Sequence, residues 1–295
     1  MTAAKPQIDG LAVIDKEAGW TSHDVVAKAR GIVGQKRVGH SGTLDPDATG
    51  VLLLGFGKVT RLLSYLTALS KSYVGEVVLG VETDTLDAAG RVTATHDMRQ
   101  VTLDEARDAA AVFVGDIEQI PPMVSAVKIG GRRLHELARA GETIERPPRP
   151  VTVHRLQIDV AEPATDTTAM VLRMEVNCSS GTYVRTLADD LGHALGGGAH
   201  LRALRRTAIG SFGLDEARPL DALEVLAPAV AMRDYPSLTA GDSVASRIAH
   251  GAVLGRDELG VDAGEGPWAV LSVTGELLAV YQGHGADRVK PAVVL

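Results

Sequence analysis

The sequence has little of what metal-dependent and disulfide-bonded proteins need. Its 295 residues include one cysteine, Cys178, which excludes an internal disulfide and a zinc cluster of thiolates. No apolar run reaches the roughly 18 to 20 residues of a membrane span, and the N-terminus lacks the apolar core of a secretion signal. We therefore expect a soluble cytoplasmic protein without membrane contact. We also expect no metal ion, because no His-Glu-x-x-His or comparable ligand pair is formed by His40, His135, His154, His193 and His200.

The chain also lacks an overall surplus of positive charge, since its formal net charge is −7 and its pI is near 5.7. Net charge describes the average surface, whereas binding of a phosphate backbone needs only one basic face. Residues 119–155 hold seven basic and three acidic side chains, a local net charge of +4. This segment is a candidate for contact with nucleic acid, and a solvated charged surface explains it equally well. Its basic residues are Lys128, Arg132, Arg133, Arg139, Arg146, Arg149 and Arg155.

The chain is long enough for one large domain and a small one, and its 45% of hydrophobic residues suffices for a core. Helices are expected from Ser22, as the N-cap, to about residue 33, and over 58–69. The capping box at 102–105 opens another, to about residue 114. One further helix is expected over 134–140, and another follows residue 185 and ends at about residue 195. Strands are expected over 11–14, 51–56, 72–81, 151–160 and 170–177. These elements interleave without strict alternation, which favours a mixed α+β core. From about residue 235, short β-like runs between glycine turns predict a small β-rich module.

Residues 39–57 form a glycine-rich turn that presents Asp45 and then continues into an apolar strand. Asp45-Pro46 is typical of a turn, since proline disfavours helical backbone in the residue before it. Gly39, Gly42 and Gly50 permit positive φ or a close approach of backbone, which an ordinary surface turn rarely needs three times. An isolated Asp-Pro is usually a carboxylate that caps its own turn. Here the neighbouring glycines favour chemistry at Asp45.

Three segments combine a glycine with a reactive or ring-bearing side chain. The first holds His40 and Asp45, the second is Lys-Ser-Tyr-Val-Gly-Glu with Tyr73, and the third is Ser-Gly-Thr-Tyr-Val-Arg-Thr with Tyr183 and Arg185. Each is weak alone, because a tyrosine in a strand is usually core or surface and an arginine at a helix start usually faces solvent. Their joint occurrence, in this order, is informative.

Together these segments resemble the TruB family of tRNA pseudouridine synthases. The stretch 71–87 is similar to the second signature of that family, and 178–185 is similar to the third. The resemblance extends from about residue 11 to 211. Its most specific part matches the catalytic motif of the family and reads Gly39-His40-Ser41-Gly42-Thr43-Leu44-Asp45-Pro46-Asp47-Ala48-Thr49-Gly50.

The resemblance implies isomerisation, without a cofactor, of the uridine at position 55 in the tRNA T loop. The N-glycosidic bond breaks, the uracil turns in place, and it is rejoined through C5. Asp45 would act at the sugar, either as a nucleophile on C1′ or as the base and electrostatic partner of a glycal route. Arg185 would be the cation that keeps Asp45 ionised. Tyr73 would lie against the base and remove the C5 proton, directly or through water, with Tyr183 beside it, although an ordinary phenol is a poor base at neutral pH.

The uridine must leave the base stack before it can be turned, so the substrate would be a loop with a flipped base. His40 would fill the vacated space, or would only hydrogen-bond its own turn. Residues 119–155 fall where the family carries an RNA-clasping insertion. The phosphate contacts expected there are Lys128, Arg132 and Arg133. Residues 201–206 resemble another family stretch, in which Arg205 and Arg206 would bind the RNA backbone and Leu204 would contact substrate or belong to the core.

The resemblance further implies a pseudouridine-synthase fold, with a largely antiparallel sheet in a catalytic domain over residues 1–225. Residues 235–295 resemble a PUA-type RNA-binding module. That match is carried by Leu277-Leu278-Ala279-Val280-Tyr281 and Arg288-Val289-Lys290-Pro291. The sequence does not decide how tightly this module would bind RNA, because several acidic residues lie near these stretches: Asp257, Glu258, Asp262 and Glu265.

Two other functions compete with a stand-alone synthase. Dyskerin-like enzymes of the same superfamily need a guide RNA and protein partners, usually lack the insertion and carry strongly basic tails. This chain has the insertion and no such tail, which favours action on tRNA without an obligate protein partner, and nothing demands more than a monomer. The other alternative is a non-catalytic tRNA chaperone that opens the T loop. The presence of Asp45, Tyr73 and Arg185 favours catalysis, with which folding assistance could coexist.

Overall fold

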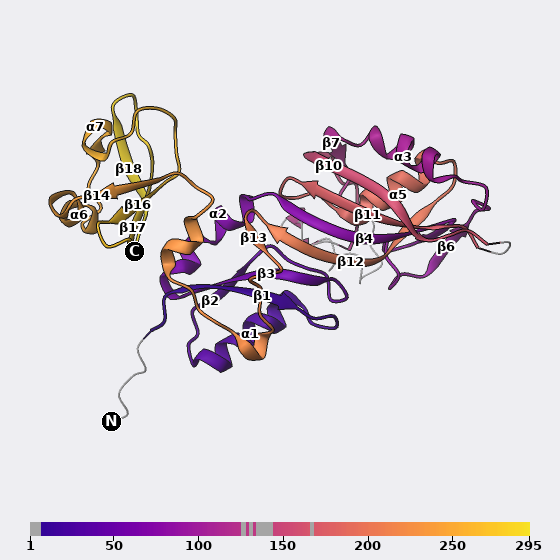
Figure 1. The fold of residues 1–295 in the computed structure, drawn as a ribbon, viewed down its shortest axis with the longest axis horizontal. Coiled ribbons are helices and arrows are strands. Elements are labelled where there is room, and N and C mark those ends of the chain that lie inside the picture. The colour runs from indigo at the N-terminus through magenta and orange to yellow at the C-terminus, as the bar shows by residue number, and fades with distance from the viewer. Residues whose placement is uncertain (1–6, 125–127, 130–131, 134–143, 166–167) are drawn as a thin grey trace. The chain divides into compact units, whose positions relative to one another are not determined.

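The computed structural model describes residues 7–124, 128–129, 132–133, 144–165 and 168–295. The chain forms two compact units (Figure 1). The first contains Met1–Pro46, Gly50–Ala68 and Ile209–Leu295, and the second contains Asp47–Thr49 and Leu69–Ala208. Both are built on mostly antiparallel sheets with helices packed against them, so the predicted mixed α+β class is confirmed. Within the described ranges, no helix is long and apolar enough to cross a membrane.

The N-terminal part of the first unit is organised around one buried strand, β3 (Thr49–Phe56). Strand β1 (Gly10–Lys16) pairs antiparallel with β3 along its whole length, and β2 (Val38–Ser41) pairs with its second half. Helix α1 (Ser22–Val33) covers these strands and contributes apolar side chains to their core. The strands predicted over 11–14 and 51–56 are thereby confirmed.

Helix α1 begins one residue earlier than the sequence predicts. Its N-cap is Thr21, whose Oγ1 accepts a hydrogen bond from the Asp24 amide at 3.1 Å, while the Asp24 carboxylate accepts one from the Thr21 amide at 2.9 Å. Ser22 is the first helical residue and is fully buried. Both hydroxyl residues suit a cap by type, and the prediction was wrong because the Ser22 hydroxyl is used for a tertiary contact with Leu44.

The segment predicted as one helix over 58–69 has two parts. It begins as the 3₁₀ helix η1 (Gly57–Leu62) and continues as α2 (Leu63–Ala68). Val59, Leu62 and Leu66 are fully buried, as their helical spacing predicts. Short elements follow in the same unit after the second unit ends: β13 (Phe212–Gly213), η2 (Leu220–Ala222) and η3 (Pro228–Met232).

Residues 237–294 form a β-rich module with a core of its own, as the sequence predicts. Its sheet has the order β14-β16-β17-β18-β15, in which β14 and β16 are parallel. The module contains β14 (Ser237–Ala240), α6 (Asp242–Ala249), β15 (Leu254–Gly255), α7 (Arg256–Leu259), β16 (Trp268–Ser272), β17 (Leu277–Gly283) and β18 (Arg288–Val294). Its RNA-binding role and the domain boundaries at 225 and 235 remain predictions.

The second unit is a twisted sheet with the strand order β12-β4-β11-β10-β7. Figure 1 shows α3 and α5 lying against these strands, and both helices contribute to one apolar core. The strands are β4 (Lys71–Leu79), β7 (Gly115–Gln119), β10 (Arg149–Glu162), β11 (Val171–Cys178) and β12 (Ala199–Ile209). The remaining elements are β5 (Val81–Thr83), β6 (Val92–Thr95), α3 (Leu103–Ala111), β8 (Lys128–Ile129), β9 (Arg132–Arg133) and α5 (Val184–Ala194).

Two predictions for this unit are settled by the structure and one is not. The capping box is present, since the Thr102 side chain and the Glu105 carboxylate bind each other's backbone amides. The helix ends at Ala111 instead of 114. Within the basic segment, β8 and β9 form an antiparallel pair. The helix predicted over 134–140 lies outside the described residues.

Asp190 on α5 gives a testable dependence of stability on pH. Burial, and then the neighbouring Asp189 carboxylate, raise the pKa of Asp190 to about 6, which His193 opposes. The folded-state pKa of Asp190 lies above the unfolded value of 3.8. The contribution of this group to the free energy of unfolding is therefore fully present at low pH and is lost as pH rises through about 6. Asp190→Asn should therefore raise the free energy of unfolding by about 1 kcal/mol at pH 8, with allowance for partial exposure, and by much less near pH 4.

Urea denaturation of both proteins at the two pH values measures this difference. Asp108→Asn is the matched control, because Asp108 is an exposed aspartate of α3. If Asp190→Asn changed the free energy of unfolding equally at pH 8 and pH 4, the raised pKa assigned to Asp190 would be contradicted.

Candidate active site

The loop that carries Asp45 is fixed on both sides of that residue. On one side, the Leu44 amide donates to Ser22 Oγ at 2.9 Å. On the other, the Pro46 carbonyl accepts from Lys16 Nζ and from the Gly19 amide, each at 2.9 Å. Asp45 itself is half-buried. Its backbone is therefore placed by hydrogen bonds that the fold supplies, which is what a preorganised carboxylate requires.

Lys16 is a positioning residue that the sequence analysis did not select. Only 1% of it is exposed, and its ammonium group also donates to the Glu17 and Trp20 carbonyls at 2.9 and 2.6 Å. A buried ammonium with three carbonyl acceptors ties the end of β1 to the loop of Asp45. The signal available in the sequence was a lysine directly after the apolar strand and before the Gly19-Trp20 turn.

The three glycines around Asp45 have the roles that the sequence predicts. Gly42 and Gly50 adopt positive φ angles of 82° and 101°. A Cβ atom on Gly39 would approach the Leu63 side chain to 2.8 Å, so backbone and side chain are close there. In the same strand as Gly39, the half-buried His40 ring packs edge-on against His23, with ring centroids 5.2 Å apart. The predicted role of His40 toward RNA remains a prediction.

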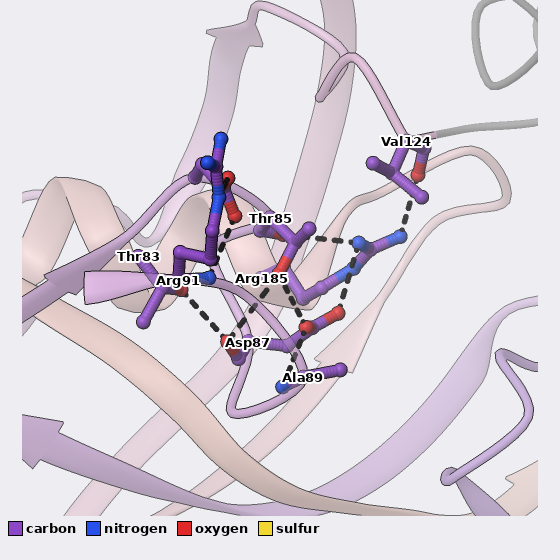
Figure 2. A network of polar contacts seen from close by, with 8 residues as sticks. Thr83, Thr85, Asp87, Ala89, Arg91, Val124 and Arg185 are labelled. Atoms are coloured by element: carbon purple, nitrogen blue, oxygen red, sulfur yellow. Dashed lines mark hydrogen bonds and ion pairs between the residues drawn. The ribbon is translucent and has the colours of Figure 1, made fainter. Parts of the chain in front are cut away.

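Arg185 occupies the first turn of α5 and is 5% exposed. Its Nη1 donates to Asp87 Oδ2 at 3.0 Å and to the Thr85 carbonyl at 3.1 Å, and its Nη2 donates to the Val124 carbonyl at 2.8 Å (Figure 2). The sequence predicts Arg185 as the cation beside Asp45. That role toward Asp45 remains a prediction, whereas the structure shows the carboxylate of Asp87 at this guanidinium, which three oxygens fix in one orientation.

Asp87 is itself held by the turn between β5 and β6. Its Oδ1 accepts from Thr85 Oγ1 at 2.6 Å and from the Ala89 amide at 3.2 Å (Figure 2). Leu86, the residue before it, has a φ of +61°, an arrangement that costs an L residue about 1 kcal/mol. The turn keeps this conformation because the Leu86 carbonyl accepts from the Leu201 amide at 3.1 Å. The Asp87 carboxylate is therefore positioned independently of any substrate.

The sequence analysis did not identify Asp87 as a site residue. It belongs to the stretch 71–87, but an aspartate in a turn rich in threonine and glycine usually bonds its own backbone. The pairing with Arg185 joins residues 98 positions apart, which no local pattern reveals. The available signal was a second carboxylate at the end of that stretch.

The two tyrosines occupy defined places in the second unit. Tyr183 is the N-cap residue of α5, and the buried side chain of Gln119 binds its amide at 2.9 Å and its carbonyl at 3.3 Å. Tyr73 lies in β4, is half-buried and packs on the same apolar core as Leu204. Both tyrosines therefore belong to one unit, as does Arg185.

The basic residues near the end of β12 differ in their surroundings. Arg205 Nη1 donates to Thr49 Oγ1 at 3.2 Å, and Arg205 is half-buried. Arg206 is 1% exposed, and its guanidinium donates to the Tyr73 side chain. Such burial does not suit a contact with solvent-exposed phosphates. Lys128, Arg132 and Arg133 lie on β8 and β9, and their phosphate contacts remain predictions.

Comparison with known proteins assigns the family. A family model described as "TruB family pseudouridylate synthase (N terminal domain)" matches residues 30–184, and one described as "tRNA pseudouridylate synthase B C-terminal domain" matches residues 185–235. The chain belongs to the TruB family. The TruB family resemblance proposed from the sequence is thereby confirmed, and with it the activity of a pseudouridine synthase.

Curated TruB relatives match almost end to end. A tRNA pseudouridine synthase B of Streptomyces coelicolor is 44% identical over 96% of this chain and 96% of its own length. Proteins of the same name from Arthrobacter sp. (strain FB24) and Bacillus pumilus are 42% and 43% identical and cover 97% and 98% of the chain. These names are consistent with a tRNA substrate for the present TruB member.

Solved structures agree with the TruB assignment at the level of the fold. A chain in "Crystal Structure of a Cbf5-Nop10-Gar1 Complex" is 27% identical, covers 97% of this chain and 83% of its own length, and superposes with a TM-score of 0.72. A chain in "Structure of H/ACA RNP bound to a substrate RNA containing 2'-deoxyuridine" gives the same TM-score at 24% identity, over 97% of this chain and 84% of its own. The predicted pseudouridine-synthase fold is confirmed.

Proposed function

We propose that this chain converts uridine to pseudouridine at position 55 of the tRNA T loop, without a guide RNA, protein partner or cofactor. The observation that carries the proposal is the carboxylate of Asp45. It lies in the most specific motif of the chain and is held by hydrogen bonds on both sides. The family assignment supplies the reaction class, and the fixed carboxylate supplies a group that can act at the sugar.

Asp45 acts at C1′ of the target nucleotide. Departure of uracil leaves C1′ electron-deficient, and a carboxylate can add to C1′ or can take the 2′ proton to give a glycal. Either route needs Asp45 ionised and correctly aimed before the base leaves. The hydrogen bonds to Leu44 and Pro46 reduce the reorganisation that this alignment requires.

Arg185 supplies positive charge to the reacting carboxylate, and Asp87 orients Arg185. A guanidinium that is 5% exposed and bound to three oxygens cannot swing away without leaving unpaired polar groups. An opposite charge near a carboxylate favours its ionised form. The Asp87–Arg185 pair is thus part of the proposed catalytic machinery.

Tyr73 and His40 act on the base and on the loop around it. The target uridine is flipped out of the stack, because C1′ and C5 cannot both be reached inside a folded loop. Tyr73 packs against the extruded uracil and takes the C5 proton after the new bond forms, with Tyr183 beside it. His40 occupies the space that the base leaves, and the basic segment 119–155 contacts phosphates.

The direct test uses purified protein and an unmodified tRNA transcript. Pseudouridine is mapped by chemical modification and primer extension, and a transcript with cytidine at position 55 serves as the control. A single new stop at position 55 in the first transcript alone supports the proposal. Tight binding to the T loop without any product would favour the chaperone or the guide-dependent alternative.

The contribution of the basic segment is tested by salt dependence. Replacing both Arg132 and Arg133 with Ala should weaken tRNA binding several-fold at low salt. Each lost phosphate contact should lower the slope of log affinity against log salt concentration by about one. Arg99→Ala is the matched control, since Arg99 is an exposed arginine paired with Asp97. An unchanged slope in the double variant would identify the segment as an ordinary solvated surface.

A further inference from the structure

A buried guanidinium lies next to the tyrosine that the proposed mechanism uses as a base. Arg206 belongs to β12 and Tyr73 to β4, which are neighbouring strands in the sheet of the second unit. Arg206 is the largest fully buried side chain of the described residues and donates a hydrogen bond to the Tyr73 side chain. Burial lowers the pKa of Arg206, which the interaction with Tyr73 opposes, and an arginine keeps its charge under these conditions.

A second cation lies close to this pair. Lys71 is two residues before Tyr73 on the same strand, so their side chains share one face of β4. Lys71 is 5% exposed, and burial, followed by the charge of Arg206, lowers its pKa to about 8. The effect of Arg206 on Lys71 places a second positive group near Arg206.

The other elements around Tyr73 supply apolar or neutral groups to this core. On β11, Val176 is opposite Tyr73 and Cys178 is opposite Lys71. Burial raises the pKa of the Cys178 thiol to about 11, so the thiol stays neutral. Helix α5 contributes apolar side chains to this core, while its Arg185 binds Asp87. Among these groups of the second unit, the charged side chain that contacts Tyr73 is therefore the guanidinium of Arg206.

We propose that Arg206 is a positioning residue that stabilises the phenolate form of Tyr73 and so makes this tyrosine an effective base for the C5 proton. The inference rests on the function proposed above. An ordinary phenol with a pKa of about 10 is ionised in roughly one molecule in a thousand at pH 7. An opposite charge in hydrogen-bond contact shifts such an equilibrium by about one to three pH units, which raises the ionised fraction about 10- to 1,000-fold.

The step balances without an additional reactant. After the new bond between C1′ and C5 has formed, the C5–H bond breaks and its electron pair restores the C5–C6 double bond. The proton passes to the Tyr73 phenolate oxygen and gives the neutral phenol, directly or through one water. The guanidinium of Arg206 keeps its protons throughout, and the phenol returns its proton to solvent before the next turnover.

The test measures ionisation in the protein free of RNA. The five tyrosines are replaced by 3-fluorotyrosine, and the fluorine NMR signal of Tyr73 is assigned from a Tyr73→Phe variant and followed against pH. Tyr65, Tyr235 and Tyr281 are internal references, because burial raises the pKa of each of these phenols. We expect the Tyr73 midpoint below theirs and at least one pH unit below that of free 3-fluorotyrosine, and a midpoint at or above that of the free amino acid overturns the proposal.

Variants of Arg206 isolate the effect of its charge. Arg206→Gln should move the Tyr73 midpoint upward by about one to three pH units, whereas Arg206→Lys, which keeps the charge, should move it by less than half as much. Arg202→Gln is the matched control, because Arg202 is an exposed arginine of the same strand that binds Glu76 and Glu162, and it should cause no shift. An unchanged midpoint in Arg206→Gln overturns the proposal. If that variant does not fold, the comparison of Tyr73 in the unsubstituted protein with free 3-fluorotyrosine still decides.

A kinetic profile separates this role from simple structural support. Release of the C5 hydrogen by Arg206→Gln should be about tenfold or more slower than in the unsubstituted protein at pH 7 and should recover as pH rises. A defect that is equal at all pH values overturns the proposal. Failure of the function proposed above is seen separately, as an unsubstituted protein that forms no pseudouridine, because the NMR titration needs no substrate.

Discussion

Asp45→Asn is expected to abolish pseudouridine formation, with a loss of about 10⁴-fold or more in the single-turnover rate. Asparagine has nearly the same shape, and the backbone contacts of Leu44 and Pro46 do not involve the replaced atom. The amide can neither add to C1′ nor take a proton. Binding of tRNA should change less than about threefold, since one internal carboxylate contributes little to a phosphate-dominated interface. Rates from rapid mixing and dissociation constants from filter binding measure the two effects separately.

Asp47→Asn is the control for this experiment. Asp47 lies two residues further along the same loop and is exposed, and its replacement makes the same change in charge. We expect it to react at a rate close to that of the unsubstituted protein. Product formation by Asp45→Asn at more than a few per cent of the normal rate would contradict the role of Asp45. Equal losses in both variants would instead point to a general effect of loop charge.

Asp87→Asn should lower the single-turnover rate by about 10²- to 10³-fold with little change in tRNA affinity. The substitution removes the charge that faces the buried guanidinium of Arg185 and leaves it with neutral acceptors at Thr85 and Val124. A cation that is 5% exposed then reorients or draws in water, and the effect proposed for it on the Asp45 carboxylate is lost. The same single-turnover and binding assays, together with the thermal midpoint of unfolding, measure the outcome.

Asp84→Asn provides the comparison within the same turn. Asp84 is exposed and binds the Arg91 side chain at 3.1 Å. Its replacement should leave the rate within about twofold. If Asp87→Asn lowers affinity for tRNA as much as the rate, Asp87 would be a binding residue. If it lowers neither, the Asp87–Arg185 pair would be a structural contact only.

Local sequence patterns correctly predicted those elements that are determined by residues close together in the chain. Thr102 and Glu105 form the expected capping box because both act within one turn of the chain. The apolar residues of β3 are buried because β1 and β2 pair with it and α1 contributes to the core in which its side chains lie. The motif around Asp45 could likewise be found because its glycines and its carboxylate are contiguous.

Features that depend on distant contacts could not be predicted in this way. Ser22 does not cap α1 because its hydroxyl binds Leu44, 22 residues later. Leu86 adopts a positive φ because the fold holds its backbone against β12. Asp87 and Arg206 resembled a turn residue and a surface cation, and their partners, Arg185 and Tyr73, are reached only through tertiary structure. In each case the residue type suited two roles, and a long-range hydrogen bond selected one.

The measurement that tests the central claim most directly is hydrogen release from C5, because rejoining uracil through C5 must expel that hydrogen. A tRNA transcript labelled with tritium at C5 of its uracils is incubated with the purified chain alone. We predict release of one equivalent of tritium per tRNA by the unsubstituted protein, none from a transcript with cytidine at position 55, and none with Asp45→Asn. Undiminished release with Asp45→Asn, or release from the cytidine transcript, would contradict an Asp45-dependent reaction at that uridine.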